Sequence, residues 1–158
     1  MGMTHNSEIR SGPVPGAAPA TLDTAYRATR YQLRLPGLPP RTLRIDQRGD
    51  RWLQHLGVGT LAIITAENPA SRRFEPACNR RRDRALARRL DRLGWPRLRT
   101  RAVDPSGQWP VELGWAIPGI DRYSARAMAA DLGQVALVWL QSGQRVRLLY
   151  TGVPPAAR

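Results

Sequence analysis

The chain has 158 residues and a formal net charge of +13, because its 25 basic residues, all of them arginine, outnumber 12 acidic ones. A single cysteine, Cys78, excludes an internal disulfide framework and a cysteine-rich zinc site. No apolar run approaches the roughly 18 residues that a membrane-spanning helix needs, and the N-terminus lacks a secretory pattern. These features predict a soluble, cytoplasmic, bacterial protein with one globular domain and no membrane partner.

The arginines have two competing explanations. Arginine, alanine, glycine and proline all have GC-rich codons, so a GC-rich genome would produce much of this composition without any selection for a polyanion. Residues 72–101, however, hold twelve arginines against three acidic residues, a local net charge of +9. This concentration is compatible with a basic face that binds nucleic acid and, as the favoured alternative, with a solvated helix face.

Composition divides the chain into three parts. Residues 1–22 are expected to form a flexible tail, since GPVPGAAP has three prolines and no apolar periodicity. Residues 153–158 are expected to fray at the C-terminus. The remaining residues, 23–152, are predicted to form a single globular domain.

In the first half of that domain, alternating apolar residues predict strands at 29–35 and 41–45. Asp50 is a candidate cap for a short helix at 51–56. The apolar, β-branched run at 60–66 predicts a central strand that is buried on both faces. Pro69 ends that strand, because proline cannot donate a backbone hydrogen bond to the sheet.

The second half opens with the most helical segment of the chain, residues 80–93. Asn79 is the predicted N-cap, Gly94 the predicted stop, and Leu86, Leu90 and Leu93 the predicted docking stripe. A second helix is predicted at 121–132, with Tyr123, Ala127, Met128 and Leu132 as candidate core residues.

Strands are predicted at 98–103 and 112–117, separated by a type I turn at residues 104–107. A hairpin is predicted from 135–140 and 145–150 across Ser142 and Gly143. The expected fold class is therefore α+β, with a mixed, mostly antiparallel sheet and two main helices and one short helix packed against it.

The segment after the central strand is the leading candidate for a binding site. Thr65, Asn68 and Ser71 carry short hydrogen-bonding side chains there, and Arg72 has the geometry to clamp a phosphate or carboxylate. The argument is that ligands gather at the carboxyl ends of strands in sheets with parallel connections. The competing interpretation is an ordinary turn in which Asn68 bonds its own backbone before Pro69.

The start of the arginine-rich helix extends this candidate site. Helix N-termini favour anions, so Asn79 and Arg82 join the predicted ligand-binding residues. Trp109 and Glu112 follow the tight turn, and Gln134 follows the second long helix. Glu112 is interpreted as a structural ion-pair partner or a general base, and Gln134 as a helix cap or a ligand contact.

No cofactor and no metal are expected. The two histidines, His5 and His55, have no spacing that suits a metal site. Glycine-rich phosphate loops are missing from the sequence as well.

Several short motifs follow one another along the chain. They are Ala25-Tyr26-Arg27 with Thr29 and Tyr31, Ile64-Thr65-Ala66 with Asn68-Pro69 and Ser71, Asn79 and its helix, Asp104-Pro105 with Gly107, Trp109-Pro110 with Glu112, and Gly133-Gln134 with Ala136. In this order and spacing, from about Asp23 to Tyr150, they resemble an uncharacterised bacterial family, the domain of unknown function DUF3293.

The resemblance implies a compact single-domain protein. It also implies that six residues do more than form turns: Thr65, Asn68, Asn79, Trp109, Glu112 and Gln134. The sequence also departs from the family pattern. Glu67 stands where an aromatic residue is common, Leu113-Gly114 replaces a Pro-Ser pair, and Val135 replaces an asparagine.

Three functions remain open from the sequence. The first is a binding module for an anionic small molecule or nucleotide at the ITAENP loop and the following helix N-terminus. The second is non-specific nucleic-acid binding through the arginine-rich face of residues 72–101. The third is a hydrolase or transferase that uses Glu112, or alternatively Glu67, as general base.

Overall fold

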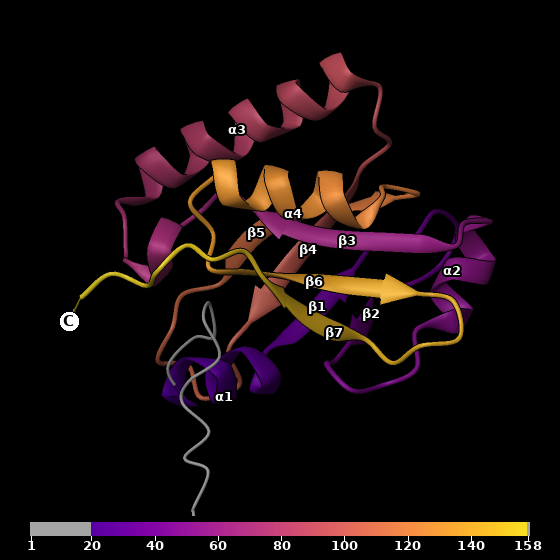
Figure 1. The fold of residues 1–158 in the computed structure, drawn as a ribbon, viewed down its shortest axis with the longest axis horizontal. Coiled ribbons are helices and arrows are strands. Elements are labelled where there is room, and N and C mark those ends of the chain that lie inside the picture. Colours follow the sequence, from indigo (N-terminus) through magenta and orange to yellow (C-terminus); the bar gives the residue numbers. More distant parts are fainter. Residues whose placement is uncertain (1–19, 158) are drawn as a thin grey trace, which may run out of the picture.

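The computed structural model describes residues 20–157. Their elements in chain order are α1 (Ala20–Ala28), β1 (Arg30–Leu33), β2 (Arg41–Leu43), α2 (Asp50–Leu56), β3 (Thr60–Thr65), the 3-10 turn η1 (Pro69–Ser71), α3 (Pro76–Leu93), β4 (Leu98–Val103), β5 (Glu112–Pro118), α4 (Arg122–Asp131), β6 (Ala136–Gln141) and β7 (Arg147–Tyr150). One sheet and its covering helices make up the unit, which is the α+β class expected from the sequence (Figure 1).

The sheet has seven strands in the order β2-β1-β4-β5-β3-β6-β7. All six strand pairs are antiparallel, so the expected mixed character is not present among the described residues. The chain after β2 approaches the chain before β7, where Asp46 N donates to Val146 O and Val146 N donates to Gln47 O, each at 2.8 Å. The sheet therefore curls until its two edges are joined near one end.

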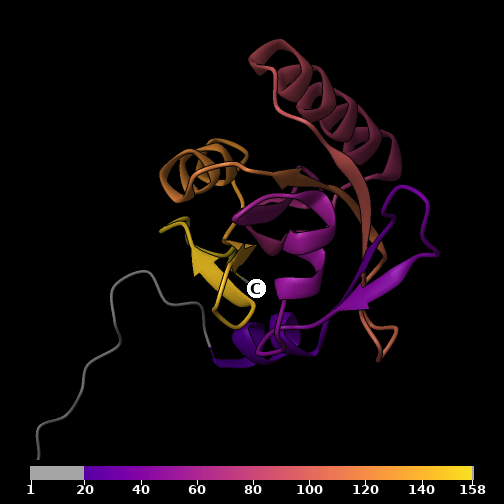
Figure 2. The same ribbon diagram turned by 90° about the vertical axis from the view of Figure 1, so that its right-hand side faces the viewer.

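Two apolar clusters fill the two faces of this curled sheet. The outer face packs against α3 and α4, with Leu86 and Leu90 from α3 and Met128 from α4 buried on it. The inner face packs against α2 through Leu53, which is 1% exposed. Figure 2 shows α2 lying inside the curl and α3 and α4 lying outside it. Burying each such leucine stabilises the fold by about 2 kcal/mol.

Most of the expected elements are confirmed. β4 has the predicted bounds, β3 is a sheet-interior strand with four successive buried residues, and β6 and β7 form the predicted hairpin. The turn after β4 closes with a hydrogen bond of 3.1 Å from Gly107 N to Asp104 O. Gly94 ends α3 in the left-handed conformation (φ 74°), which glycine adopts without steric cost.

Three details of the helices differ from expectation. α3 begins at Pro76, so Asn79 lies within it rather than capping it, because proline at the first turn starts the helix earlier. Leu93 is 57% exposed, and only two of the three predicted leucines dock. Tyr123 is 84% exposed and Ala127 is exposed as well, since α4 buries Ala125, Met128 and Ala129 instead.

The first helix, α1, was not predicted by periodicity. It holds an ion pair between Arg27 and Asp23 at 2.7 Å, and Arg27 also reaches Asp46 at 3.0 Å. The Tyr150 hydroxyl donates to Asp23, which ties α1 to β7. Most of the expected tail at residues 1–22 lies outside the described residues.

Candidate functional site

A cavity of about 1150 Å³ lies at the end of the curl opposite α2. α1 covers it from one side, and the inner face of the sheet forms the other (Figure 1). The loop after β3, the loop between β4 and β5, and residues 155–157 complete its wall. Its lining is more apolar than polar and includes a limited set of polar groups, as in small-molecule sites generally.

Glu112, the first residue of β5, is the polar centre of this cavity. Its Oε1 accepts a hydrogen bond from Asn68 Nδ2 and another from Trp109 Nε1, both at 2.8 Å. Its Oε2 has no hydrogen-bond partner among the described residues, although Glu112 lines the cavity. One carboxylate oxygen is thus held by the protein while the other is left available to a ligand.

Asn68 is held by four hydrogen bonds beneath the cavity. It and Asn79 form a reciprocal pair, in which Asn68 N donates to Asn79 Oδ1 at 3.0 Å and Asn79 Nδ2 donates to Asn68 Oδ1 at 2.9 Å. Asn68 Oδ1 also accepts from Phe74 N at 2.9 Å. With Nδ2 bound to Glu112, every polar group of the Asn68 side chain has a partner, so its amide orientation is fixed.

The loop that carries Asn68 is strained. Asn68, Ala70 and Ser71 have φ values of 47°, 56° and 56°, a left-handed region that costs a non-glycine residue roughly 1 kcal/mol or more. Ala70 is held from both sides, because its N donates to Gly133 O and its O accepts from Ala156 N, each at 2.7 Å. Such strain clusters at binding sites, where the surroundings over-determine the backbone.

Ser71 lies against α1 through a hydrogen bond of 2.6 Å between its Oγ and the hydroxyl of Tyr26. Tyr31 donates in turn to the backbone O of Tyr26 at 3.2 Å. Burial is the main cause that raises the pKa of the Tyr26 hydroxyl, so this hydroxyl remains protonated and able to donate near neutral pH. Both Tyr26 and Ser71 line the cavity.

Burial also raises the pKa of Glu112 above its usual value of 4.5, against the lowering effect of its bonds from Trp109 and Asn68. Glu67 has a raised pKa for the same main reason, but its Oε2 accepts from Leu113 N at 3.0 Å and the residue does not line the cavity. The two carboxylates that the sequence offered as general bases are therefore distinguished by position. Glu112 alone of the pair faces the cavity.

Gln134 supplies a second free acceptor to the cavity. Its Nε2 donates to Glu67 O at 2.9 Å, and its Oε1 has no hydrogen-bond partner among the described residues. The residue is 7% exposed and lines the cavity. Thr65 lines the cavity too, but its hydroxyl is occupied, because it donates to Leu113 O at 2.7 Å and accepts from Glu67 N at 3.0 Å.

Arg73 and Trp109 form the cationic part of the wall. The Arg73 guanidinium lies 5.1 Å from the centroid of the Trp109 ring and donates to Gln108 O. Arg73 has no carboxylate partner among the described residues, so its charge remains available to an anion. Asp104 orders this loop, since its carboxylate accepts from Trp109 N at 2.9 Å and from Ser106.

The structure thus brings together five of the residues predicted to bind a ligand, together with Glu112. Those that line the cavity are Thr65, Asn68, Ser71, Trp109, Gln134 and Glu112.

Three other predicted residues do not line it. Asn79 supports Asn68 from below, Arg72 lies 5.6 Å from the Phe74 ring, and Arg82 donates to the backbone oxygens of Ala66 (2.6 Å) and Leu132 (2.8 Å). Arg82 therefore joins the end of β3 to the end of α4.

Tyr26 and Arg73 were not among the predicted site residues. Tyr26 was part of the segment that carries the family resemblance, which was the available signal for it. Arg73 stood beside Arg72 in the sequence, and nothing in the pattern distinguished which of the two arginines faces the cavity.

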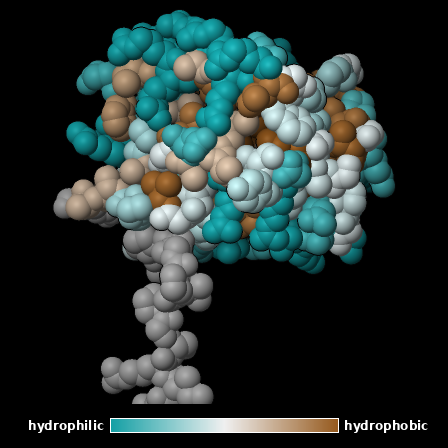
Figure 3. All heavy atoms as spheres, turned by 45° about the horizontal axis from the view of Figure 1, so that its top comes forward, coloured by the Kyte–Doolittle hydropathy of each residue, from teal (hydrophilic) through white to brown (hydrophobic). Residues whose placement is uncertain are grey.

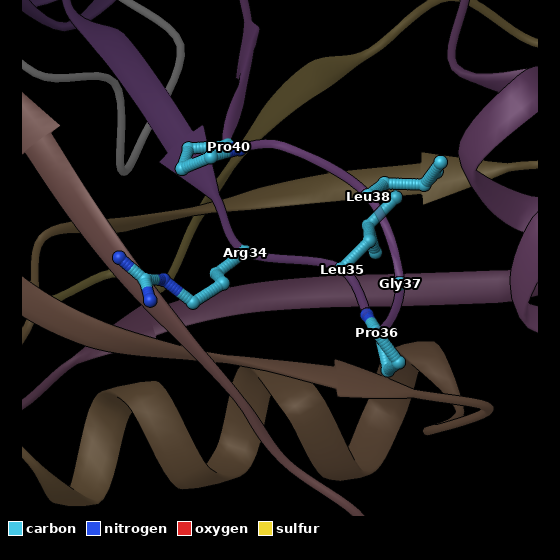
Figure 4. Close-up of a pocket in the computed structure, with 6 residues that line it drawn as sticks. All are labelled: Arg34, Leu35, Pro36, Gly37, Leu38 and Pro40. Atoms are coloured by element: carbon cyan, nitrogen blue, oxygen red, sulfur yellow. The ribbon is translucent and has the colours of Figure 1, made fainter.

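A second, smaller concavity of about 460 Å³ lies at the connection between β1 and β2. Leucine, proline and glycine residues make up most of its lining, and Arg34 is its one charged member. Figure 4 shows the Arg34 side chain extending away from the apolar residues of that turn. This concavity lacks a converging set of polar groups, and we do not assign it a site.

Residues 20–157 contain no group of three or more His, Cys, Asp or Glu side chains arranged to hold a metal ion. His55 lies at the end of α2, where its Nε2 is 3.4 Å from Pro36 O. Within the same range, no helix combines the length and apolar character needed to cross a membrane.

Comparison with known proteins gives one family match, and it covers some of the segments that line the cavity. The search gave no significant match to a curated protein or to a solved structure. A family model matches residues 64–137, which run from β3 to β6 and include the loop at Asn68, Trp109, Glu112 and Gln134. Over these 74 of its 158 residues, the chain resembles the family described as "Protein of unknown function (DUF3293)".

Proposed function

We propose that the protein is a binding module for a small molecule that enters the cavity between α1 and the sheet. The observation that carries this proposal is the free Oε2 of Glu112, a part-buried carboxylate in the cavity wall whose other oxygen is fixed by two hydrogen bonds. A carboxylate oxygen that is fixed in position and has no protein partner is available to accept hydrogen bonds from a ligand.

The chemistry of the free groups defines what the ligand presents. Glu112 Oε2 and Gln134 Oε1 are both acceptors, so the facing edge of the ligand carries N–H donors. Arg73 supplies an unpaired cation elsewhere on the wall, which favours an anionic group on the ligand. A purine nucleotide with N–H donors on its base, such as guanosine monophosphate, satisfies both conditions.

This proposal moves the anion contact away from the helix N-terminus. The two predicted residues of α3 are already engaged within the protein: the Asn79 side chain is bound to Asn68, and Arg82 is bonded to backbone oxygens. Arg73 remains as the unpaired cation of the cavity wall. A nucleotide remains the proposed kind of ligand, as in the sequence analysis. The residue expected to contact its phosphate is now Arg73 in place of Arg72 and Arg82.

The experiment is a thermal-shift and calorimetric titration with guanosine, guanosine monophosphate and inorganic phosphate. We expect guanosine monophosphate to raise the melting temperature, since a ligand that binds only the folded state stabilises it. Glu112→Gln replaces the free oxygen by an N–H donor and should abolish the effect of both guanosine and its monophosphate. Arg73→Gln should weaken the monophosphate but leave guanosine unchanged.

Glu75→Gln is the matched control, because Glu75 is an exposed glutamate outside the cavity. The proposal fails if millimolar guanosine monophosphate leaves the wild-type protein unchanged. It also fails if Glu75→Gln reduces binding as strongly as Glu112→Gln, since the effect would then come from net charge alone.

A hydrolase or transferase is a second candidate, favoured by the raised pKa of Glu112. A general base works best when its pKa approaches the working pH, and a buried carboxylate moves in that direction. Prolonged incubation with guanosine monophosphate, followed by phosphate and nucleoside analysis, tests it. If wild-type protein converts the nucleotide and Glu112→Gln does not, the protein is an enzyme. If wild-type protein binds the nucleotide and leaves it intact, the protein is a binding module.

A further inference from the structure

The outer face of α3 carries five arginines that make no hydrogen bond or ion pair through their side chains with any described residue. All five are exposed, and they are Arg80, Arg81, Arg84, Arg88 and Arg92. The other two arginines of α3 behave differently: Arg82 bonds backbone oxygens, and Arg89 pairs with Asp131 at 2.9 Å. The structure therefore separates arginines that hold the fold together from arginines that do not.

These five residues, called the arginine stripe below, share one side of the helix. At about 100° per residue they fall within an arc of about 120°. Leu86 and Leu90, which dock α3 on the sheet, lie on roughly the opposite side. Figure 3 shows hydrophilic residues gathered over the part of the surface where α3 lies.

The acidic residues of α3 do not neutralise this stripe. Asp83 is 6% exposed and is bound by Arg99 at 2.8 and 3.0 Å. Asp91 is bound by Arg97 through both carboxylate oxygens, at 2.9 and 3.1 Å. Because both carboxylates are paired with arginines of the following segment, the stripe keeps its full positive charge.

We propose that the arginine stripe binds the phosphate backbone of duplex nucleic acid without sequence preference. The stripe is straight and extends for about 18 Å, from Arg80 to Arg92 at about 1.5 Å per residue. A duplex carries about one phosphate charge per 1.7 Å of its axis when both strands are counted, so a length of duplex equal to the stripe carries about ten charges. Arginine suits this contact, because its planar fork of donors matches phosphate oxygens.

Two observations favour a duplex over other polyanions. The stripe contains no aromatic side chain on which unpaired bases would stack, and such stacking supplies much of the affinity for single strands. The apolar side of α3 is buried against the sheet, so the helix has no free apolar face with which to enter a lipid surface. The duplex contact proposed for the arginine stripe and the ligand proposed for the cavity do not depend on each other.

The test measures binding of the full chain to a fluorescein-labelled 24-base-pair DNA duplex of arbitrary sequence by fluorescence anisotropy, across a salt series. With five phosphate contacts, the slope of log K against log [salt] has a contribution of about −4.5 from the stripe. That contribution corresponds to about 500-fold weaker binding when salt rises fourfold. Replacing all five stripe residues by glutamine should make the slope shallower by about 4.5.

The matched control replaces five other exposed arginines that also make no side-chain hydrogen bond or ion pair with the described residues: Arg30, Arg34, Arg41, Arg44 and Arg51. It changes the net charge equally but leaves the stripe intact, so its slope should stay close to that of the wild type. Glutamine is a good helix former at exposed positions, and an unchanged circular-dichroism spectrum checks the fold of both variants.

Four results would overturn the proposal. They are no duplex binding at low salt, equal losses in the stripe and control variants, tighter binding of a 24-nucleotide single strand than of the duplex, and stripe-dependent binding to phosphatidylserine vesicles with none to the duplex. Loss of guanosine monophosphate binding through Glu112→Gln with duplex binding intact would show that the two surfaces act separately.

Discussion

Asn68 is predicted to be the most important single residue for the geometry of the cavity. It is 3% exposed, and its side chain makes hydrogen bonds with Glu112, Phe74 and Asn79. Asn68→Ala removes all three, and each contributes about 1 kcal/mol. Alanine also tolerates the left-handed backbone less well than asparagine, which adds about 1 kcal/mol. The expected loss is therefore about 4 kcal/mol of unfolding free energy.

Asn68→Gly separates the two contributions. Glycine loses the same three hydrogen bonds but adopts a φ of 47° without steric cost, so it should lose about 3 kcal/mol, less than alanine. Urea unfolding followed by tryptophan fluorescence measures both values, with Gln54→Ala on the exposed surface of α2 as the control. A loss below about 1 kcal/mol for Asn68→Ala would refute the hydrogen-bond argument, and equal losses for alanine and glycine would refute the strain argument.

Four further predictions concern the rest of the fold. Ala70→Gly should raise the unfolding free energy by up to about 1 kcal/mol, because it relieves a φ of 56°; an unchanged urea midpoint would contradict this. Leu90→Ala should cost about 3 kcal/mol and Leu93→Ala less than about 0.5 kcal/mol, as measured by urea unfolding, since Leu90 is fully buried and Leu93 is 57% exposed. Asp83→Ala should cost about 2 kcal/mol on the same measure, because it leaves Arg99, whose side chain is 36% exposed, without its partner. Burial raises the pKa of Glu112 above 4.5, so the folded state favours the protonated carboxyl. Wild-type protein should therefore lose stability relative to Glu112→Gln as the pH rises above about 4.5, and a constant difference in unfolding free energy would contradict this.

The predicted binding loop after β3 borders the cavity, but the sequence argument for that loop does not apply to this sheet. The sequence argument relied on parallel connections, whereas every described strand pair is antiparallel. The residues converge because β3 ends where β5 begins: Thr65 pairs with Gly114, which brings Asn68 to Glu112. The sequence showed short polar residues after one buried strand and a carboxylate at the start of another. It did not show the register in which these two strands pair.

Strands were easier to predict than the faces of helices. Alternation along β4 gave its bounds, because a strand buried in a sheet has a period of two regardless of its neighbours. For α3 and α4 the apolar period of the sequence was correct, but the contact with the sheet decides which apolar residues are buried, and Leu93 and Tyr123 lie beyond that contact. The position of α1 depends on Tyr150 and Asp46, residues far from it in sequence.

The central claim is that a ligand occupies the cavity and contacts Glu112. The indole N–H of Trp109 donates to Glu112 Oε1, so its proton NMR signal reports on that carboxylate directly. Titration with guanosine monophosphate should shift the Trp109 indole signal, assigned with Trp109→Phe, and leave that of Trp52 on α2 in place. An unmoved Trp109 signal at millimolar nucleotide, or an equal shift of the Trp52 signal, would contradict the account.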